Sequence, residues 1–111
     1  MGRGGPLRGS KVMHVIVDLC VIPMGVGTSV STYVAVCQEI LEEAGLEYRL
    51  HAYGTNVEGS WDAVFAAIKT CHTRIHDLGA PRVSTSIKVG TRTDRTTSIS
   101  EKIKSVQNKL T

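Results

Sequence analysis

The sequence is poor in aromatic side chains, which make up 5% of its 111 residues. Proteins that bind single-stranded nucleic acid stack the bases on exposed aromatic rings, and such rings are scarce here. The formal net charge of +3 does not indicate nucleic acid either, because Arg3, Arg8 and Lys11 all lie in the first 11 residues. Without these three cations the chain has as many acidic as basic residues. We therefore expect no nucleic-acid partner.

Long apolar runs are also missing, since none approaches the roughly 18 residues that a membrane-spanning helix requires. Cysteine is scarce: Cys20, Cys37 and Cys71 are far apart and form no CxxC pair, which gives no support for a zinc or dithiol motif. Each of them lies in an apolar pattern, which predicts buried free thiols in a reducing compartment such as the cytoplasm. We expect no membrane association, no metal and no cofactor.

Residues 1–11 are rich in glycine and lack the apolar core of a signal peptide. This composition predicts a disordered N-terminal tail, although a short organelle-targeting arm is an open alternative. The remaining residues, 12–111, suffice for one hydrophobic core but not for two. We therefore predict a single domain over 12–111.

Alternating apolar residues predict four strands. They cover 12–22, 46–53, 55–58 and a segment that starts at Arg82. Apolar residues at helical spacing predict three helices, which begin at Ser29 or Ser31 and end at 44, cover 60–78, and cover 99–110. The resulting order, βαββαβ with an extra C-terminal helix, predicts a ferredoxin-like α/β sandwich, which is an α+β fold.

Two crossovers on one sheet place the first and third strands at its centre and both crossover helices on one face. The other face carries apolar as well as polar residues, so we expect a second subunit to cover it in a homo-oligomer. Asp18 lies on this mixed face, where a buried carboxylate requires a structural partner or a ligand. Helical spacing also predicts that Trp61 and Leu78 are buried, and that Gln38 faces water.

The segment from Arg82 to Asp94 carries most of the candidate polar chemistry. Arg82 and Lys88 lie on one face of its strand, and Arg92 follows a turn that is predicted at Gly90. This polar face suits an anion or a polar ligand, and it equally suits a contact with another subunit.

Three further groups have both a functional and a structural interpretation. The loop at 25–29 presents backbone amides to an anion, or it is a plain strand-to-helix turn. Glu58 pairs with a cationic ligand group, or it complements a helix N-terminus. His72 and His76 have the spacing of metal ligands, but without a third ligand we expect them to face solvent. Because no catalytic set is recognisable, we expect a binding protein and not an enzyme.

Four motifs follow one another along the chain: Pro23-Met-Gly25, Ser29-Val-Ser-x-Tyr33-Val34, Gly54-Thr55-x-x-Glu58-Gly59 and Arg82-Val83-x-Thr85-x-Ile87-Lys88-x-x-x-Arg92-x-Asp94. Together they resemble the small thiamine-binding protein family, to which the YkoF-like proteins are related. The resemblance covers Val12 to Leu110, and the segments 51–61 and 89–94 look most like the fungal members.

The resemblance implies a homotetramer, a dimer of dimers, that binds thiamine, a thiamine phosphate or its hydroxymethylpyrimidine moiety without catalysis. It also implies ligand-binding residues. Hydrogen bonds to the pyrimidine would come from Thr28, Ser29, Ser31, Thr55 and Thr85. Ring cover would come from Met24 and Tyr53, charge pairing from Asp18 or Glu58, and phosphate contacts from Arg82, Lys88 and Arg92. The alternative is a structural or interaction protein in which the same residues build the tetramer.

Overall fold

Four strands and three helices follow one another in the predicted order βαββαβα. They are β1 (His14–Met24), α1 (Ser31–Glu43), β2 (Glu47–His51), β3 (Gly54–Ser60), α2 (Trp61–Asp77), β4 (Arg82–Thr91) and α3 (Ile99–Asn108). This computed structural model describes residues 12–27, 30–94 and 98–110. The tail predicted at 1–11 lies outside the described residues.

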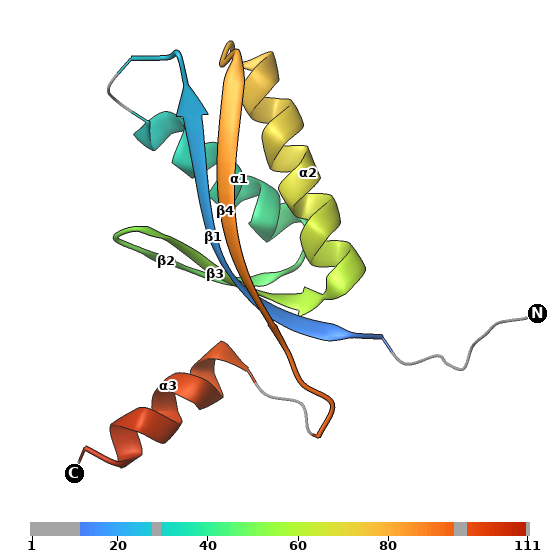
Figure 1. Ribbon diagram of the computed structural model, residues 1–111, viewed down its shortest axis with the longest axis vertical. Helices are drawn as coiled ribbons and strands as arrows, with labels where there is room; N and C mark the ends of the chain where they lie inside the picture. Colours follow the sequence, from blue (N-terminus) through green and yellow to red (C-terminus); the bar gives the residue numbers. More distant parts are fainter. Residues whose placement is uncertain (1–11, 28–29, 95–97, 111) are drawn as a thin grey trace, which may run out of the picture.

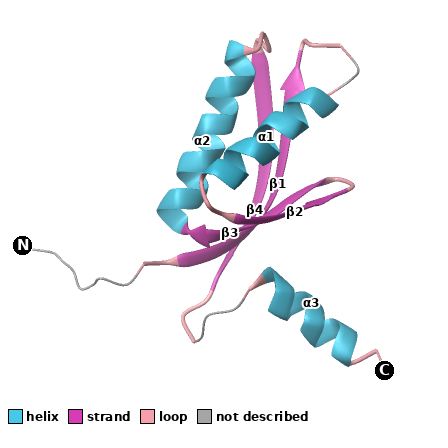
Figure 2. Cartoon of the chain, turned by 180° about the vertical axis from the view of Figure 1, so that it is seen from behind, coloured by secondary structure: helices cyan, strands magenta, loops and turns pink. Residues whose placement is uncertain are grey.

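The strands form one antiparallel sheet in the order β2-β3-β1-β4, so β1 and β3 are central, as the crossover argument predicts. α1 and α2 cover one face, which Figure 2 shows in front of the sheet. Figure 1 looks onto the opposite face, here called the bare face, where only the start of α3 is attached. This arrangement confirms the predicted ferredoxin-like fold class.

The hydrophobic core fills the space between the two helices and the sheet. The odd-numbered residues of β1 point into it, and the side chains of Val15 and Val17 are almost completely buried. α1 contributes Leu41 and α2 contributes Ile75, both without exposed surface. Each such buried side chain stabilises the fold by about 1.5–3 kcal/mol relative to an exposed one. The apolar stripes of the two helices therefore hold them on the sheet.

Side-chain caps determine where α2 and α3 begin. Ser60 accepts a hydrogen bond from the Ala63 amide at 3.2 Å. Ser98 and Glu101 form a reciprocal capping box, in which each side chain accepts from the other residue's amide at 3.0 and 3.1 Å. None of the described helices is long and apolar enough to cross a membrane.

β1 has the predicted length but lies two residues further along the chain, because it includes Pro23 and Met24, which pair with Val83 and Arg82 of β4. Proline has no amide hydrogen and interrupts the middle of a sheet, but it is tolerated along an unpaired edge. Beyond Leu19, β1 has no partner in β3, so one of its edges is unpaired there. β4 also continues through its predicted turn and ends at Thr91.

Two burial predictions for α2 are wrong. Trp61 and Leu78 are 40% and 49% exposed. Trp61 is the first residue of α2 and Leu78 is its C-cap, so each lies at an end of the helix. Trp61 packs instead against Phe65, with 4.7 Å between ring centroids.

Replacing Leu41 by alanine should lower the free energy of unfolding by about 2–5 kcal/mol, because it leaves a cavity between α1 and the sheet. Urea denaturation measures this change. Glu39→Ala is the matched control, since Glu39 is exposed on the same helix and its loss should change stability by roughly 0.5 kcal/mol or less. Equal effects of the two substitutions would contradict the packing of α1 described above.

Candidate functional site

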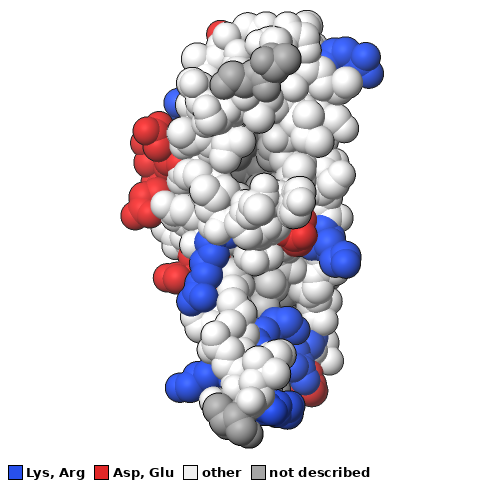
Figure 3. All heavy atoms as spheres, turned by 90° about the vertical axis from the view of Figure 1, so that its left-hand side faces the viewer, with Lys and Arg blue, Asp and Glu red and all other residues white. Residues whose placement is uncertain are grey.

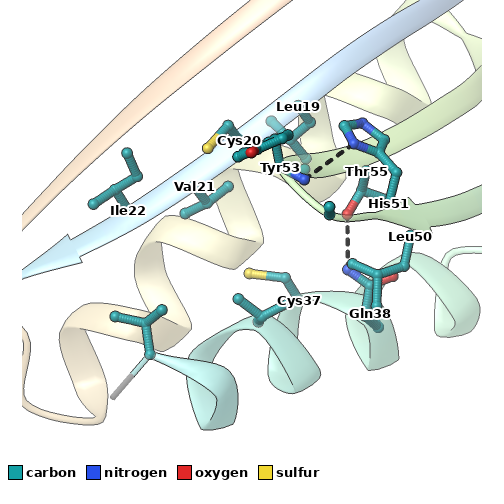
Figure 4. Close-up of a pocket in the computed structure, with 14 residues that line it drawn as sticks. Leu19, Cys20, Val21, Ile22, Cys37, Gln38, Leu50, His51, Tyr53 and Thr55 are labelled. Carbon is teal, nitrogen blue, oxygen red and sulfur yellow. Dashed lines mark hydrogen bonds between the residues drawn. The ribbon is translucent and has the colours of Figure 1, made fainter. Parts of the chain in front are cut away.

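A hollow of about 310 Å³ lies between α1, the second half of β1 and the β2–β3 hairpin (Figure 4). We call it the hairpin hollow. Its walls are largely apolar, and they include Leu19, Val21, Val30, Val34, Cys37 and Leu50. Gln38, His51, Tyr53 and Thr55 are its main polar side chains. The described residues that line it include no Asp, Glu, Lys or Arg.

The hairpin is held close to β1 by a glycine. A Cβ atom at Gly54 would lie 2.5 Å from the backbone carbonyl oxygen of Leu19. Any larger residue at this position would therefore push the hairpin away from β1 and widen the hollow.

Gln38 and Thr55 meet inside the hollow. The Gln38 side chain donates from Nε2 to the Thr55 hydroxyl oxygen at 2.9 Å, as the dashed line in Figure 4 shows. The other end of the same amide, Oε1 of Gln38, is buried and has no hydrogen-bond partner among the described residues. A buried polar atom without a partner costs about 1–3 kcal/mol, and native proteins rarely retain one without a reason. This acceptor is the one buried polar side-chain atom of the described residues that is left without a partner.

The prediction that Gln38 faces water is therefore wrong. The residue lies four positions after Val34 and directly after Cys37, at the border of the apolar stripe of α1. The i, i+4 relation to Val34 was the available signal, because residues four apart share a helix face. A polar side chain at the border of an apolar stripe is the pattern that could have identified it.

His51, at the rim of the hollow, is hydrogen-bonded at both ring nitrogens. Its Nδ1 accepts the Tyr53 amide at 3.3 Å, so the proton resides on Nε2, which donates to Oδ1 of Asp18 at 2.7 Å. Asn56 donates to the same Asp18 oxygen at 3.4 Å. His51 consequently has no free lone pair with which to act as a general base. Asp18 has structural partners, but its side chain is 48% exposed instead of buried, because it lies on the bare face.

A second hollow, of about 900 Å³, lies on the bare face between β1, β4, the turn after β4 and α3. It includes Asp18, Lys88 and Arg92. Strand register places Lys88 opposite Asp18. Arg92 donates to both carboxylate oxygens of Asp94 at 2.6 and 2.5 Å, and this hydrogen-bonded carboxylate raises the pKa of Arg92. Because carboxylates accompany these cations, the second hollow is not a purely cationic pocket.

The sheet thus divides the predicted ligand residues between two faces. Tyr53 and Thr55 line the hairpin hollow, whereas Asp18, Lys88 and Arg92 line the second hollow. Five others line neither: Met24, Ser31, Glu58, Arg82 and Thr85. Thr28 and Ser29 lie outside the described residues. The structure therefore does not gather these residues around one hollow, although His51 at the rim of the hairpin hollow donates to Asp18 of the second.

Glu58 has a structural partner at each oxygen. Its Oε1 accepts the amide of Ile99, the first residue of α3, at 3.0 Å, and its Oε2 lies 3.2 Å from Nε2 of His14. Glu58 therefore complements a helix N-terminus, as one alternative proposed, but the helix is α3 and not α2. Arg49 adds a hydrogen bond to Ser100 at 2.5 Å. These contacts attach the start of α3 to the bare face.

Thr85 is engaged with α2, because its hydroxyl is hydrogen-bonded to Nε2 of His72 at 2.5 Å. His76 donates from Nδ1 to the carbonyl oxygen of Ala80 at 2.8 Å. The prediction that both histidines face solvent is wrong for His72, which is half-buried against β4. It is right for His76, which is exposed and also binds the turn before β4. In the described part of the chain, no cluster of three or more His, Cys, Asp or Glu residues is suited to a metal.

A profile of the Thiamine-binding protein family matches residues 17–107. The chain belongs to this family. A UPF0045 protein from Synechocystis sp. is 60% identical over 103 residues, which cover 93% of this chain and 85% of that protein. A UPF0045 protein from Eremothecium gossypii is 37% identical over 99 residues, which cover 88% and 94% of the two chains.

Solved structures share the fold. A hypothetical protein from Methanocaldococcus jannaschii superposes with a TM-score of 0.80 at 32% identity, over 86% of this chain and 97% of that one. A protein from Thermotoga maritima, provisionally described as a thiamine biosynthesis/salvage protein, has a TM-score of 0.71 over 84% and 98% of the two chains. Its identity of 18% supports the fold alone.

Glu58→Ala should release α3 while the sheet and its two crossover helices remain folded. The reason is that the substitution removes the acceptor for the Ile99 amide and the partner of His14. Hydrogen exchange measures the result as lost protection within α3 alone. Glu47→Ala is the control, because Glu47 lies opposite Glu58 in the strand register but is exposed. Unchanged protection of α3 in Glu58→Ala would contradict this role.

Proposed function

We propose that the protein binds the aminopyrimidine half of thiamine in the hairpin hollow, as a binding protein and not as an enzyme. The ligand is thiamine, a thiamine phosphate or the free hydroxymethylpyrimidine. Membership of the thiamine-binding family supports a thiamine-related role. The observation that carries the proposal is a largely apolar hollow with no acidic or basic side chain other than His51 in its wall, lined by the hydrogen-bonded pair Gln38 and Thr55, where Oε1 of Gln38 is buried without a partner among the described residues.

An aminopyrimidine presents an amino donor next to a ring nitrogen acceptor. Gln38 offers the complementary acceptor, Oε1, and the neighbouring Thr55 hydroxyl retains its own proton after accepting from Gln38. The Gln38 acceptor would receive the amino donor of the ring, and the Thr55 hydroxyl would donate to the ring nitrogen beside it. The apolar walls would cover the ring faces, which is typical of small-molecule sites with few polar groups. Tyr53 is 87% exposed at the rim, where its ring can cover the entrance after binding.

The charge distribution favours the pyrimidine over the phosphates. Figure 3 shows that Lys and Arg gather toward the end of the molecule that carries α3, while the depression in the upper part is bordered by uncharged side chains. A phosphate placed in the hairpin hollow would lose its hydration without gaining a cationic partner. The thiazolium ring and any phosphates would therefore extend outward past Tyr53, whose π face can accept a cation.

Calorimetry with hydroxymethylpyrimidine, thiamine and thiamine diphosphate tests this site. Saturable binding is expected, with the diphosphate the weakest of the three. Gln38→Leu and Thr55→Val should each weaken binding by roughly tenfold or more, because each removes a buried hydrogen bond to the ligand. Thr85→Val is the matched control, since Thr85 contacts His72 outside the hollow. If folded protein gives no heat with any ligand, or if Thr85→Val is as weak as Thr55→Val, the proposed site is wrong.

We further propose that the protein is a homotetramer, a dimer of dimers, assembled through the bare face and α3. On α3, Ile103, Val106 and Leu110 are 41%, 60% and 79% exposed, although they lie on its apolar side. Ile22 and Met24 are exposed on the bare face of β1. Exposed apolar residues on one side of a helix and on one face of a strand are surfaces that a second copy of the chain could cover, as an isologous contact requires.

Ile103→Asp combined with Val106→Asp should dissociate the assembly, because it places charge in the apolar contact. Sedimentation velocity measures the change in size, with Gln107→Asp on the same helix as the control. Retention of ligand binding by the dissociated variant would separate binding from assembly.

An interaction protein without a ligand is the alternative function. It predicts that the double substitution dissociates the assembly, and that no ligand binds before or after dissociation. An unchanged sedimentation coefficient would exclude α3 from the interface.

The free thiols favour a reducing compartment, and we propose the cytoplasm. Cys37 and Cys71 are buried and Cys20 is half-buried, and none of the three is in a disulfide. Unpaired cysteines are typical of proteins that are kept reduced.

A further inference from the structure

β1 changes from a central strand to an edge strand beside the hairpin hollow. On one side it pairs with β4 as far as Met24. On the other side its pairing with β3 stops at Leu19, which lies opposite Thr55. Among the described residues, no other strand pairs with this side of β1 beyond Leu19. The last part of β1 therefore has an unpaired edge, here called the free edge.

The hairpin hollow runs along the free edge. Its wall includes Leu19 and Val21, whose side chains point to the helix side of the sheet. It also includes Cys20 and Ile22, which alternate with them and point to the bare face. Side chains from both faces of a strand line one hollow only where the hollow passes the edge between them. The backbone of Val21 is thus accessible from the hollow.

Strand geometry decides which backbone groups project from the free edge. A Cβ atom at Gly54 would lie 2.5 Å from the carbonyl oxygen of Leu19, so this carbonyl group points toward β3. In an antiparallel sheet the N–H and C=O of one residue point to the same side, and the side alternates along the strand. The N–H and C=O of Val21 therefore also point away from β4, at a position where β3 is no longer present.

Pro23 is consistent with this assignment. It pairs with Val83 of β4 and lies two residues after Val21, so its backbone nitrogen also belongs to the free edge. Because proline has no N–H, it is tolerated where that group would make no hydrogen bond within the sheet.

We propose that the backbone N–H of Val21 is the second recognition point of the hairpin hollow, and that it donates to the ring nitrogen opposite the amino group of the aminopyrimidine. This inference rests on the function proposed above. Gln38 and Thr55 would bind the amino group and the ring nitrogen beside it. The second ring nitrogen lies across the ring and needs a donor from another wall. Figure 4 shows Val21 on the β1 side of the space, apart from Gln38 and Thr55.

This contact would select pyrimidines among flat heterocycles of similar shape. A pyridine analogue of hydroxymethylpyrimidine, with CH in place of the ring nitrogen opposite the amino group, has nearly the same volume. When it is bound, the Val21 N–H loses water and gains no acceptor. The wild-type protein should therefore bind the analogue roughly threefold to tenfold more weakly than hydroxymethylpyrimidine.

Amide hydrogen exchange, followed by NMR, tests the free edge before any ligand is added. The Val21 amide should exchange faster than those of Cys20 and Ile22, which point toward β4. Hydroxymethylpyrimidine at about 100 times its Kd should slow the exchange of Val21 by roughly tenfold or more, and by more than that of its two neighbours. If Val21 is as protected as they are in the free protein, the free edge is wrong. If ligand binds and leaves its exchange unchanged, the contact is wrong.

Val21→Pro removes the N–H and keeps the pairing with β4, as Pro23 does. In calorimetry this variant should bind hydroxymethylpyrimidine and the pyridine analogue equally. Val21→Ala is the matched control, since it shortens the same side chain but retains the N–H, and it should keep the preference for the pyrimidine. Circular dichroism checks the fold of both variants, and the exchange experiment on the wild-type protein needs neither.

Two failures are distinguishable. Absence of binding to the wild-type protein refutes the proposed function and the Val21 contact with it. Binding that is lost in Gln38→Leu, with a preference for the pyrimidine that persists in folded Val21→Pro, overturns the Val21 contact alone. The same holds if the wild-type protein binds both ligands equally.

Discussion

The alternation of side chains along β1 is the constraint on which the rest of the structure depends. Val15, Val17 and Leu19 fill the core, so the intervening residues, Asp18 among them, must lie on the bare face. A shift of one residue in register would exchange the two sets and expose the core. Because β1 pairs with both β3 and β4, this alternation also decides the orientation of their side chains. The alternation thereby places Thr55 on the helix side of the sheet and Asp18 and Lys88 on the bare face.

This separation gives the two faces different chemistry. The helix side holds a hollow with neutral polar groups, where a flat heterocycle can be bound with little cost in desolvated charge. The bare side holds ion pairs such as Arg92 with Asp94, together with exposed apolar residues of β1 and α3. Of these apolar residues Ile22 also lines the hairpin hollow, whereas those of α3 do not.

Local periodicity determined much of this protein: the order of its elements, the central strands and the start of α2 at Ser60 all follow from patterns within a few residues. The motifs were also enough to indicate the thiamine-binding family. Only the tertiary structure decided which polar residues share a site, and there it separated Thr55 from Lys88, assigned Glu58 to α3 and brought Gln38 into the hollow. The physical reason is that periodicity assigns a residue to a face of its own element. Which other element covers that face depends on contacts between residues far apart in the sequence.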